Sequence, residues 1–278
     1  ANTQHLYVRT DVLKENGITI PKTYEDVVAA SEKIRAAGKM KYPYAAAYKA
    51  GWNLAEEFVN MYIGHGGEFF EAGSAKPSIN NAKGVATLNM LKKLADLSNP
   101  DYLTHDSEAI KVEWESGNVA IMTLWASRSG TLLDDEGDAK ITAATKLVAP
   151  ATVGGGNIPA ATLWWDGFTL AKNRPDADAE ASFRAMAHAA SSKEMVAKAA
   201  DQAVWLVEGF VPGPKSVGVI EAVKMGAKPY PMLPQMGLMH GALGSEIVEF
   251  LQGNESAEQA LKDVEAAYNT KAKEQGFL

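Results

Sequence analysis

The start of the chain carries the pattern that most constrains its fold. An apolar run over 6–13 predicts a strand that leads into a short helix, and a proline-led turn follows. Thr23 stands at an N-cap position three residues before Asp26, which gives an acidic form of the capping box. We therefore predict an amphipathic helix over 24–37. A strand and a capped helix joined in this way indicate an α/β protein.

The rest of the chain alternates strand-like apolar runs with amphipathic helices, which supports the α/β class. The expected strands lie over 42–48, 119–124, 141–148 and 161–170. The expected helices lie over 54–63, 81–97, 176–190 and 192–201, with one more ending at Gly117 and three after the Pro212-Gly213-Pro214 turn. Ser256 and Gln259 form a second capping box at the start of the last helix. The Gly154-Gly155-Gly156 connector and the Pro212 turn are the two places where a change of lobe is expected.

Composition excludes several classes of function. The chain has 278 residues, a formal charge of −7 and 27 dispersed basic residues, so we predict no nucleic-acid partner. No apolar run approaches the roughly 20 residues that cross a bilayer, and no signal-peptide pattern opens the chain. The absence of cysteine excludes a disulfide scaffold and a cysteine nucleophile, and it is compatible with the periplasm.

No motif for catalysis, a metal or a cofactor is present. The five histidines show none of the zinc-site spacings, and neither a nucleophile elbow nor a phosphate-binding loop occurs. The Gly154-Gly155-Gly156 run lacks the dinucleotide spacing, and the acidic run over 134–138 has no bidentate glutamate at the offset of a calcium loop. We predict a protein without catalytic residues, metal or cofactor.

Six tryptophans are the remaining chemical signal. Four of them fall at the ends of predicted elements, whereas Trp114 and Trp205 fall in expected helices and are predicted to be core. A sugar presents an apolar C–H face and a rim of hydroxyls, so its site needs aromatic rings beside polar side chains that face a groove. The tryptophans at element ends are therefore candidates for a carbohydrate site.

This order of elements resembles the segment where the chain crosses between lobes in the solute-binding proteins of bacterial ABC importers, in the sugar-binding, maltose-binding type. The resemblance implies a two-lobed, periplasmic-binding-protein-like (type II) fold. In that family the segment comes well after the amino terminus, so the fold is expected to be incomplete, with the C-terminal lobe largely whole. The implied division is residues 1–158 for the main part of that lobe, 159–213 for a returning segment of the N-terminal lobe, and 214–278 for a helical completion. We expect the returning segment either to be loosely packed or to be completed by polypeptide from outside these residues, because an unpaired strand is unstable.

The resemblance also implies ligand-binding residues. Trp52 follows a strand and falls where the family places an aromatic ring under the sugar. Trp125 and Arg128 lie in a loop that often carries a cleft aromatic. Asn2 falls where relatives use an acidic or amide side chain at the lobe crossing, and Lys215 matches a position often held by a basic residue.

A second candidate group is the run from Trp164 to Phe168. Neighbouring strand residues point to opposite faces, so one of Trp164 and Trp165 is expected in the core, and the other is expected to line the cleft with Asp166. Gly167 matches the glycine-containing turn that the family carries here. Asp166 replaces a more usual glycine, and its carboxylate could accept from ligand hydroxyls or pair with a cation.

The sequence therefore predicts a binding protein that closes two lobes around a small carbohydrate or polyol and delivers it to ABC transporter permease subunits. Its expected location is periplasmic or extracellular. Two alternatives stay open. One is a carbohydrate-active enzyme that pairs Asp166 with a second carboxylate in a tryptophan-lined groove. The other is a scaffold or receptor-docking protein that has lost ligand binding.

Overall fold

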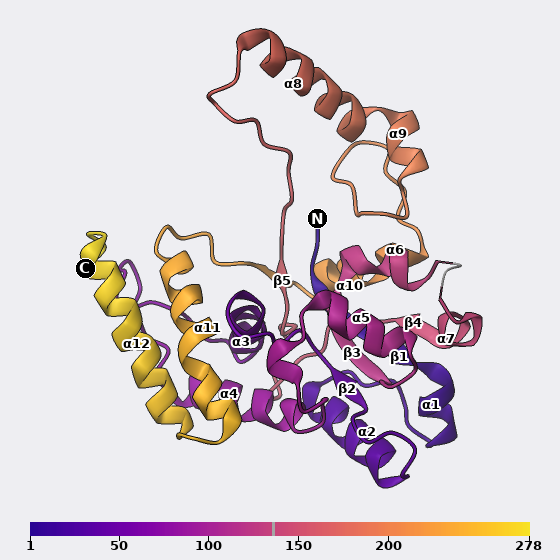
Figure 1. The fold of residues 1–278 in the computed structure, drawn as a ribbon, viewed down its shortest axis with the longest axis vertical. Coiled ribbons are helices and arrows are strands. Elements are labelled where there is room, and N and C mark those ends of the chain that lie inside the picture. Colours follow the sequence, from indigo (N-terminus) through magenta and orange to yellow (C-terminus); the bar gives the residue numbers. More distant parts are fainter. Residues whose placement is uncertain (135–136) are drawn as a thin grey trace.

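The computed structural model describes residues 1–134 and 137–278 and shows an α/β body from which an arm extends (Figure 1). The centre of the body is a four-stranded sheet in the order β2-β3-β1-β4. β1 (Gln4–Arg9) pairs antiparallel with β3 (Ile121–Trp125) and with β4 (Thr145–Leu147), and β2 (Tyr44–Ala45) pairs parallel with β3. Every residue of β1 is buried, as expected for a strand covered on both faces.

The predicted capping box at the start of the chain is confirmed. α2 (Tyr24–Ala36) begins after Thr23, whose hydroxyl accepts from the Asp26 N–H at 3.0 Å, while the Asp26 carboxylate accepts from the Thr23 N–H at 3.1 Å. Tyr24, Val27 and Ile34 form part of the buried face of this helix. The cap and the apolar stripe together explain why this segment is helical.

Four helices pack together beside the sheet, at the left of Figure 1. They are α3 (Trp52–Gly64), α4 (Ala82–Ala95), α11 (Met236–Gln252) and α12 (Ala257–Glu274). α11 packs on each of the other three, and all residues of α3 after Asn53 are buried. The remaining helices of the body are α1 (Thr10–Glu15), α5 (Ser107–Glu115), α6 (Ser129–Leu132), α7 (Ala139–Ala144) and α10 (Val217–Lys224), with short 3₁₀ turns at Tyr102–Thr104, Ala126–Arg128 and Pro214–Ser216.

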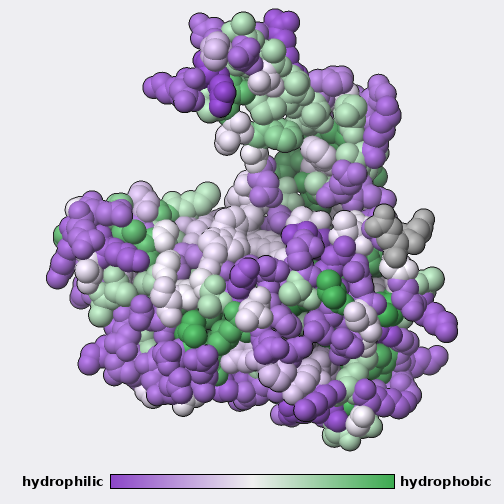
Figure 2. All heavy atoms as spheres, in the orientation of Figure 1, coloured by the Kyte–Doolittle hydropathy of each residue, from purple (hydrophilic) through white to green (hydrophobic). Residues whose placement is uncertain are grey.

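The arm begins where the chain leaves a second, two-stranded sheet. In that sheet β5 (Thr162–Leu163) pairs parallel with β6 (Lys228–Pro229). The arm carries α8 (Asp176–Ser191) and α9 (Lys193–Lys198), and α8 has no buried residue. Figure 2 shows apolar residues on the surface of the arm, where Phe183 is 62% exposed. The expected loose packing of this segment is therefore present, while the division of the chain into lobes at 158 and 213 remains a prediction.

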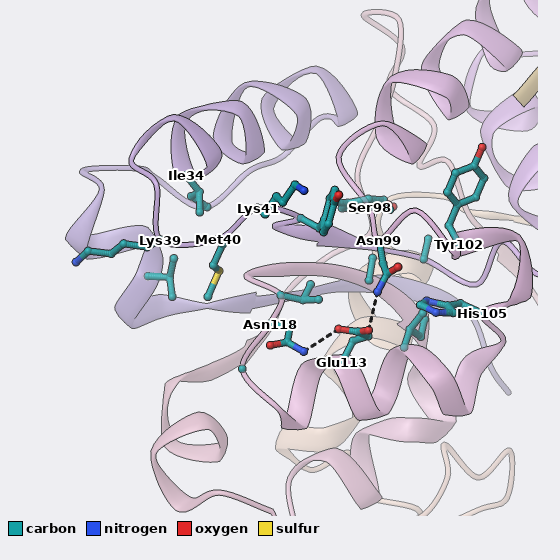
Figure 3. A pocket seen from close by; sticks show the side chains of 18 of the residues that line it. Ile34, Lys39, Met40, Lys41, Ser98, Asn99, Tyr102, His105, Glu113 and Asn118 are labelled. Carbon is teal, nitrogen blue, oxygen red and sulfur yellow. Dashed lines mark hydrogen bonds between the residues drawn. The ribbon is translucent and has the colours of Figure 1, made fainter. Parts of the chain in front are cut away.

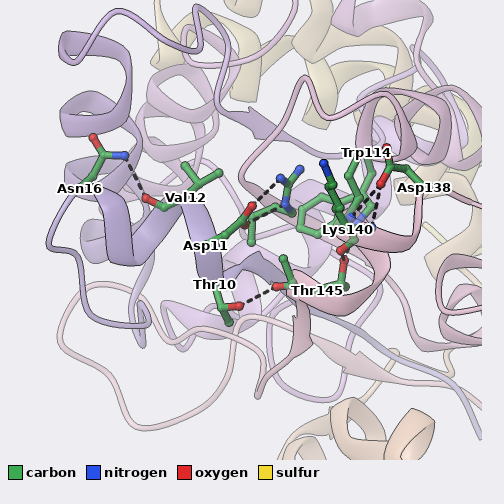
Figure 4. Close-up of polar contacts among 11 residues, drawn as sticks. Thr10, Asp11, Val12, Asn16, Trp114, Asp138, Lys140 and Thr145 are labelled. Carbon is green, nitrogen blue, oxygen red and sulfur yellow. Dashed lines mark hydrogen bonds and ion pairs between the residues drawn. The ribbon is translucent and has the colours of Figure 1, made fainter.

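Three predicted strands are wrong in extent. The first half of 141–148 is helical, because Asp138 caps α7 by accepting from the Lys140 N–H at 2.7 Å (Figure 4). Of 161–170 only Thr162–Leu163 lies in a strand; Trp164 adds a single bridge to Asn2, and the chain then leaves for the exposed arm. Of 42–48 only Tyr44–Ala45 pairs, because β3 meets it over two residues.

The remaining predictions for tryptophans and caps have mixed outcomes. Trp114 is fully buried and its indole donates to Thr145 Oγ1 at 3.1 Å, as predicted for core (Figure 4). Trp205 lies outside any helix, in the loop after α9, and is only half-buried, so that prediction is wrong. Ser256 caps α12, but the Gln259 side chain bonds Asp263 and does not complete the box. Residues 135 and 136 of the acidic run lie outside the described residues.

Candidate ligand-binding site

Five rings from separate elements meet at one surface of the body, and we call them the aromatic cluster: Trp52, Trp125, Trp164, Tyr230 and His240. The Trp52 ring lies 6.2 Å from Trp125, 5.8 Å from Trp164 and 5.0 Å from His240, between centroids. Trp164 lies 6.0 Å from Trp125 and 4.4 Å from Tyr230. Trp52 remains 50% exposed, so the cluster presents a ring to solvent.

Close contact between two helices positions Trp52. Gly51 precedes it with a φ of 97°, a conformation that favours glycine, and its N–H donates to the Gly244 carbonyl at 3.0 Å. A Cβ on Gly244 would lie 2.3 Å from the Gly51 carbonyl oxygen, so α11 can approach this turn only with glycine there. His240 of α11 adds a contact, with Nε2 3.0 Å from the Trp52 carbonyl oxygen. The start of α3 is thus fixed against α11.

Trp164 is held from the inside of the body. Its indole N–H lies 3.1 Å from Glu56 Oε1 and 2.9 Å from Thr162 Oγ1, and its backbone pairs with that of Asn2. Glu56 is fully buried in α3, and burial raises the pKa of its carboxyl to about 8. The neighbouring Glu57 is also buried, and desolvation raises its pKa to about 8 as well.

A pocket of about 440 Å³ adjoins the cluster. Asn2 lies in its wall and holds the chain after Trp125, because its Oδ1 accepts from the Ser127 N–H at 3.1 Å and its Nδ2 donates to Ser127 Oγ at 3.2 Å. Asp166 and Lys215 supply opposite charges to the lining. The pocket is also lined by Gly167, Phe168, Asp201 and Trp205. Its mixed apolar and polar wall suits a small ligand with both kinds of surface.

The structure brings most of the predicted site residues into these two places. Trp52, Trp125 and Trp164 form the core of the aromatic cluster, and Asn2, Asp166, Gly167 and Lys215 line the adjoining pocket.

The other two predicted residues lie apart. The Arg128 side chain forms an ion pair with Glu108 of α5. Trp165 is 56% exposed and makes no ring contact with the aromatic cluster among the described residues. Trp164 is therefore the inward member of the tryptophan pair. The ligand roles of all nine residues stay predictions.

Sequence reasoning missed Glu56 and two rings of the cluster, Tyr230 and His240. Both lie in the last part of the chain. Tyr230 follows β6 and reaches Trp164 through the pairing of β6 with β5, where its N–H donates to the Leu163 carbonyl at 3.2 Å, whereas His240 reaches the cluster through the packing of α11 on α3. Glu56 carried a signal that could have been recognised, because two adjacent carboxyls flanked by the apolar residues Leu54, Ala55, Phe58 and Val59 are unusual in a helix.

A second pocket of about 350 Å³ lies between the end of α2 and α5 (Figure 3). Glu113 of α5 accepts hydrogen bonds there from the Asn99 and Asn118 side chains, each at 3.0 Å. None of the predicted site residues lines this pocket. In the part of the chain that the structure describes, no cluster of His, Cys, Asp or Glu could hold a metal ion, and no helix is long and apolar enough to cross a bilayer.

Comparison with known proteins identifies the class. The model of the bacterial extracellular solute-binding protein family matches residues 1–197, so the chain belongs to that family. Among curated proteins it is similar to a probable ABC transporter-binding protein of Deinococcus radiodurans, with 31% identity over 176 residues, 60% of this chain and 40% of that protein. A probable amino-acid ABC transporter periplasmic-binding protein of Sinorhizobium fredii matches at 29% identity over 115 residues, 41% of this chain and 26% of that protein.

The fold is shared with solved solute-binding proteins. The maltose-bound MalE3 of T. maritima matches with a TM-score of 0.82 and 19% identity, over 97% of this chain and 70% of that one. The chain thus has a type II, periplasmic-binding-protein-like fold, and it spans 40% and 26% of the length of the two curated relatives.

Proposed function

We propose that this protein is the substrate-binding component of an ABC importer and that its ligand is a small carbohydrate or polyol. The observation that carries the proposal is the aromatic cluster beside a polar-walled pocket, in a member of the extracellular solute-binding family. The fold shared with a maltose-bound protein supports the ligand class.

The aromatic cluster and the adjoining pocket suit different parts of a sugar. An exposed ring such as that of Trp52 can cover the C–H face of a sugar, where a large aromatic buries roughly 150–250 Å². Asn2, Asp166 and Lys215 can hydrogen-bond hydroxyls, which must find partners once they leave water. A polyol presents the same hydroxyls on an open chain. The protein itself needs only to bind and release.

Delivery requires that the empty and the ligand-bound protein differ in conformation. In this proposal the ligand binds the closed arrangement of two lobes more tightly than the open one and so shifts the population toward it. The closed form then docks on permease subunits in the membrane. This role places the protein in the periplasm or outside the cell, in agreement with the family description.

A panel of thermal shifts tests the ligand class. Maltose, monosaccharides, sugar acids and polyols are each added to the 278-residue chain, with amino acids as a second class because one relative is a probable amino-acid transporter protein. A ligand at 100 times its dissociation constant stabilises the fold by about 2.7 kcal/mol, enough to measure. A shift confined to amino acids, or no shift at all, would contradict the carbohydrate proposal.

A pair of variants localises the site. Trp52→Ala removes the exposed ring of the cluster and should weaken binding of the active compound at least about tenfold, as expected when a stacked aromatic is lost. Phe183→Ala removes an aromatic of similar exposure from the arm and should leave binding unchanged. Purified protein is also incubated with chromogenic glycosides, since turnover would favour the enzyme alternative.

A further inference from the structure

Two adjacent carboxyls, Glu56 and Glu57, lie inside the body on α3, and only one of them contacts the aromatic cluster. Glu56 has no exposed surface and Glu57 is 4% exposed. Glu56 Oε1 is bonded, whereas Glu56 Oε2 and Glu57 Oε1 have no hydrogen-bond partner among the described residues. Burying a carboxyl in an apolar helix opposes folding, so its presence calls for a role.

The bonds of Glu56 lead directly to a ring of the candidate site. Its Oε1 accepts from the Trp164 indole N–H at 3.1 Å and from Thr162 Oγ1 at 2.8 Å. Thr162 Oγ1 lies in turn 2.7 Å from Asn60 Oδ1, and Asn60 Nδ2 donates to Gln4 Oε1 at 3.3 Å. This chain of polar groups joins α3, β5 and β1 beneath Trp164.

The same bonds restrict the orientation of the indole. Its N–H is shared between Glu56 Oε1 of α3 at 3.1 Å and Thr162 Oγ1 of β5 at 2.9 Å. The ring centroid lies 4.4 Å from that of Tyr230 and 6.0 Å from that of Trp125. A tryptophan held only by apolar contacts could rotate about its side-chain torsions. An indole N–H is a donor only, so an inward acceptor fixes which edge faces the core.

We propose that Glu56 is a positioning residue, whose carboxyl accepts the indole N–H of Trp164 and so holds that ring in the orientation that meets the ligand. The inference rests on the proposed function for its consequence, while the positioning itself concerns this chain alone. Glu57 provides the matched comparison, because it shares the helix and the burial of Glu56 but not its contact with Trp164.

The indole N–H signals in a ¹⁵N–¹H spectrum test the positioning without any ligand. The chain has six tryptophans, and Trp164→Phe identifies which signal belongs to Trp164. Glu56→Leu should shift that signal upfield and speed its exchange with water severalfold, because the N–H loses one of its two acceptors and keeps only Thr162 Oγ1. Glu56→Gln keeps an acceptor oxygen and should restore slow exchange. Glu57→Leu should leave the Trp164 signal in place.

The outcomes separate this inference from the proposed function. If Glu56→Leu leaves the Trp164 signal and its exchange unchanged, or if Glu57→Leu moves it equally, Glu56 does not position the ring. If either leucine variant unfolds, Glu56→Met against Glu57→Met gives the same comparison, because the unbranched side chain also lacks the carboxyl oxygens that accept from the indole. Maltose is the probe for the consequence: Glu56→Leu and Trp164→Phe should each weaken its binding, and the double variant no further than the worse single one. Wild-type protein that binds no compound of the panel would end the proposed function and leave the spectroscopic result standing.

Discussion

The body and the arm contain helices of similar length and amphipathic pattern but differ in what those helices bury. α11 and α12, of 17 and 18 residues, pack on each other and on the rest of the body, with Leu243, Ile247 and Leu261 among the side chains that are almost fully buried. α8, of 16 residues, buries none. The difference shows that an apolar stripe specifies a helix, while its contribution to stability depends on a surface that covers the stripe.

The candidate site lies across the boundary between these regions. Trp52 and Trp125 belong to the body, whereas Asp166 and Trp205 reach the pocket from the two ends of the arm. Segments with few buried contacts open locally with low free energy. We therefore expect the aromatic part of the site to be the stable part and the pocket wall from the arm to be the adjustable one.

The largest difference in the free energy of unfolding between body and arm should come from truncating one phenylalanine in each region. Phe58 of α3 is fully buried, so Phe58→Ala should lower the free energy of unfolding by about 3–5 kcal/mol. Phe183→Ala on α8 should change it by less than about 0.5 kcal/mol, since the ring is already in solvent. Urea denaturation followed by circular dichroism measures both. A large effect of Phe183→Ala would mean that the arm packs on a surface in solution.

The buried carboxyls of the body should give a pH dependence that the arm lacks. Burial raises the pKa of Glu56 and Glu57 from 4.5 to about 8. Between these two pH values the folded chain therefore keeps both carboxyl protons, whereas the unfolded chain has released them. This contribution is fully present below pH 4.5 and is lost as the pH rises through 8, by on the order of a few kcal/mol. The melting temperature should therefore be higher at pH 5.5 than at pH 8.5.

Variants can show which residues cause this fall in melting temperature with rising pH. The double variant Glu56→Gln, Glu57→Gln should flatten the fall in melting temperature across that window. Glu180→Gln on α8 is the control, because Glu180 is exposed and paired with Arg184 at 2.7 Å. An unchanged slope in the double variant would show that other groups carry the pH dependence.

The smallest contrast concerns the helix caps. Thr23 caps α2 in the body and Ser192 caps α9 in the arm. Thr23→Ala should cost about 1 kcal/mol of the free energy of unfolding, because the Asp26 N–H loses its acceptor. Ser192→Ala should leave the same urea transition within about 0.5 kcal/mol, since α9 can fray without unfolding the body. Equal effects would mean that the arm unfolds together with the body.

The parts of the fold that could be predicted are those set by local chemistry. The capping box at Thr23, the apolar run that became β1 and the helices α4 and α8 all follow from residue types a few positions apart. The extent of the strand expected over 161–170 could not be predicted in this way, because strand length depends on neighbours: β6 pairs with Thr162 and Leu163, and Asn2 pairs with Trp164 alone. The strand expected over 141–148 is wrong in its first half for a local reason, the N-cap at Asp138.

For the candidate site, the residue types at the ends of predicted elements were enough to point to Trp52, Trp125 and Trp164. Capping and periodicity act over a few residues, so local sequence specified most of the helices, the central strands and the supply of rings and polar groups between them. Long-range packing decided that Tyr230 and His240 join those rings, that Glu56 lies beneath Trp164 and that Trp165 faces solvent. These outcomes depend on which helix packs against which, and that choice is fixed by contacts between residues far apart in the chain.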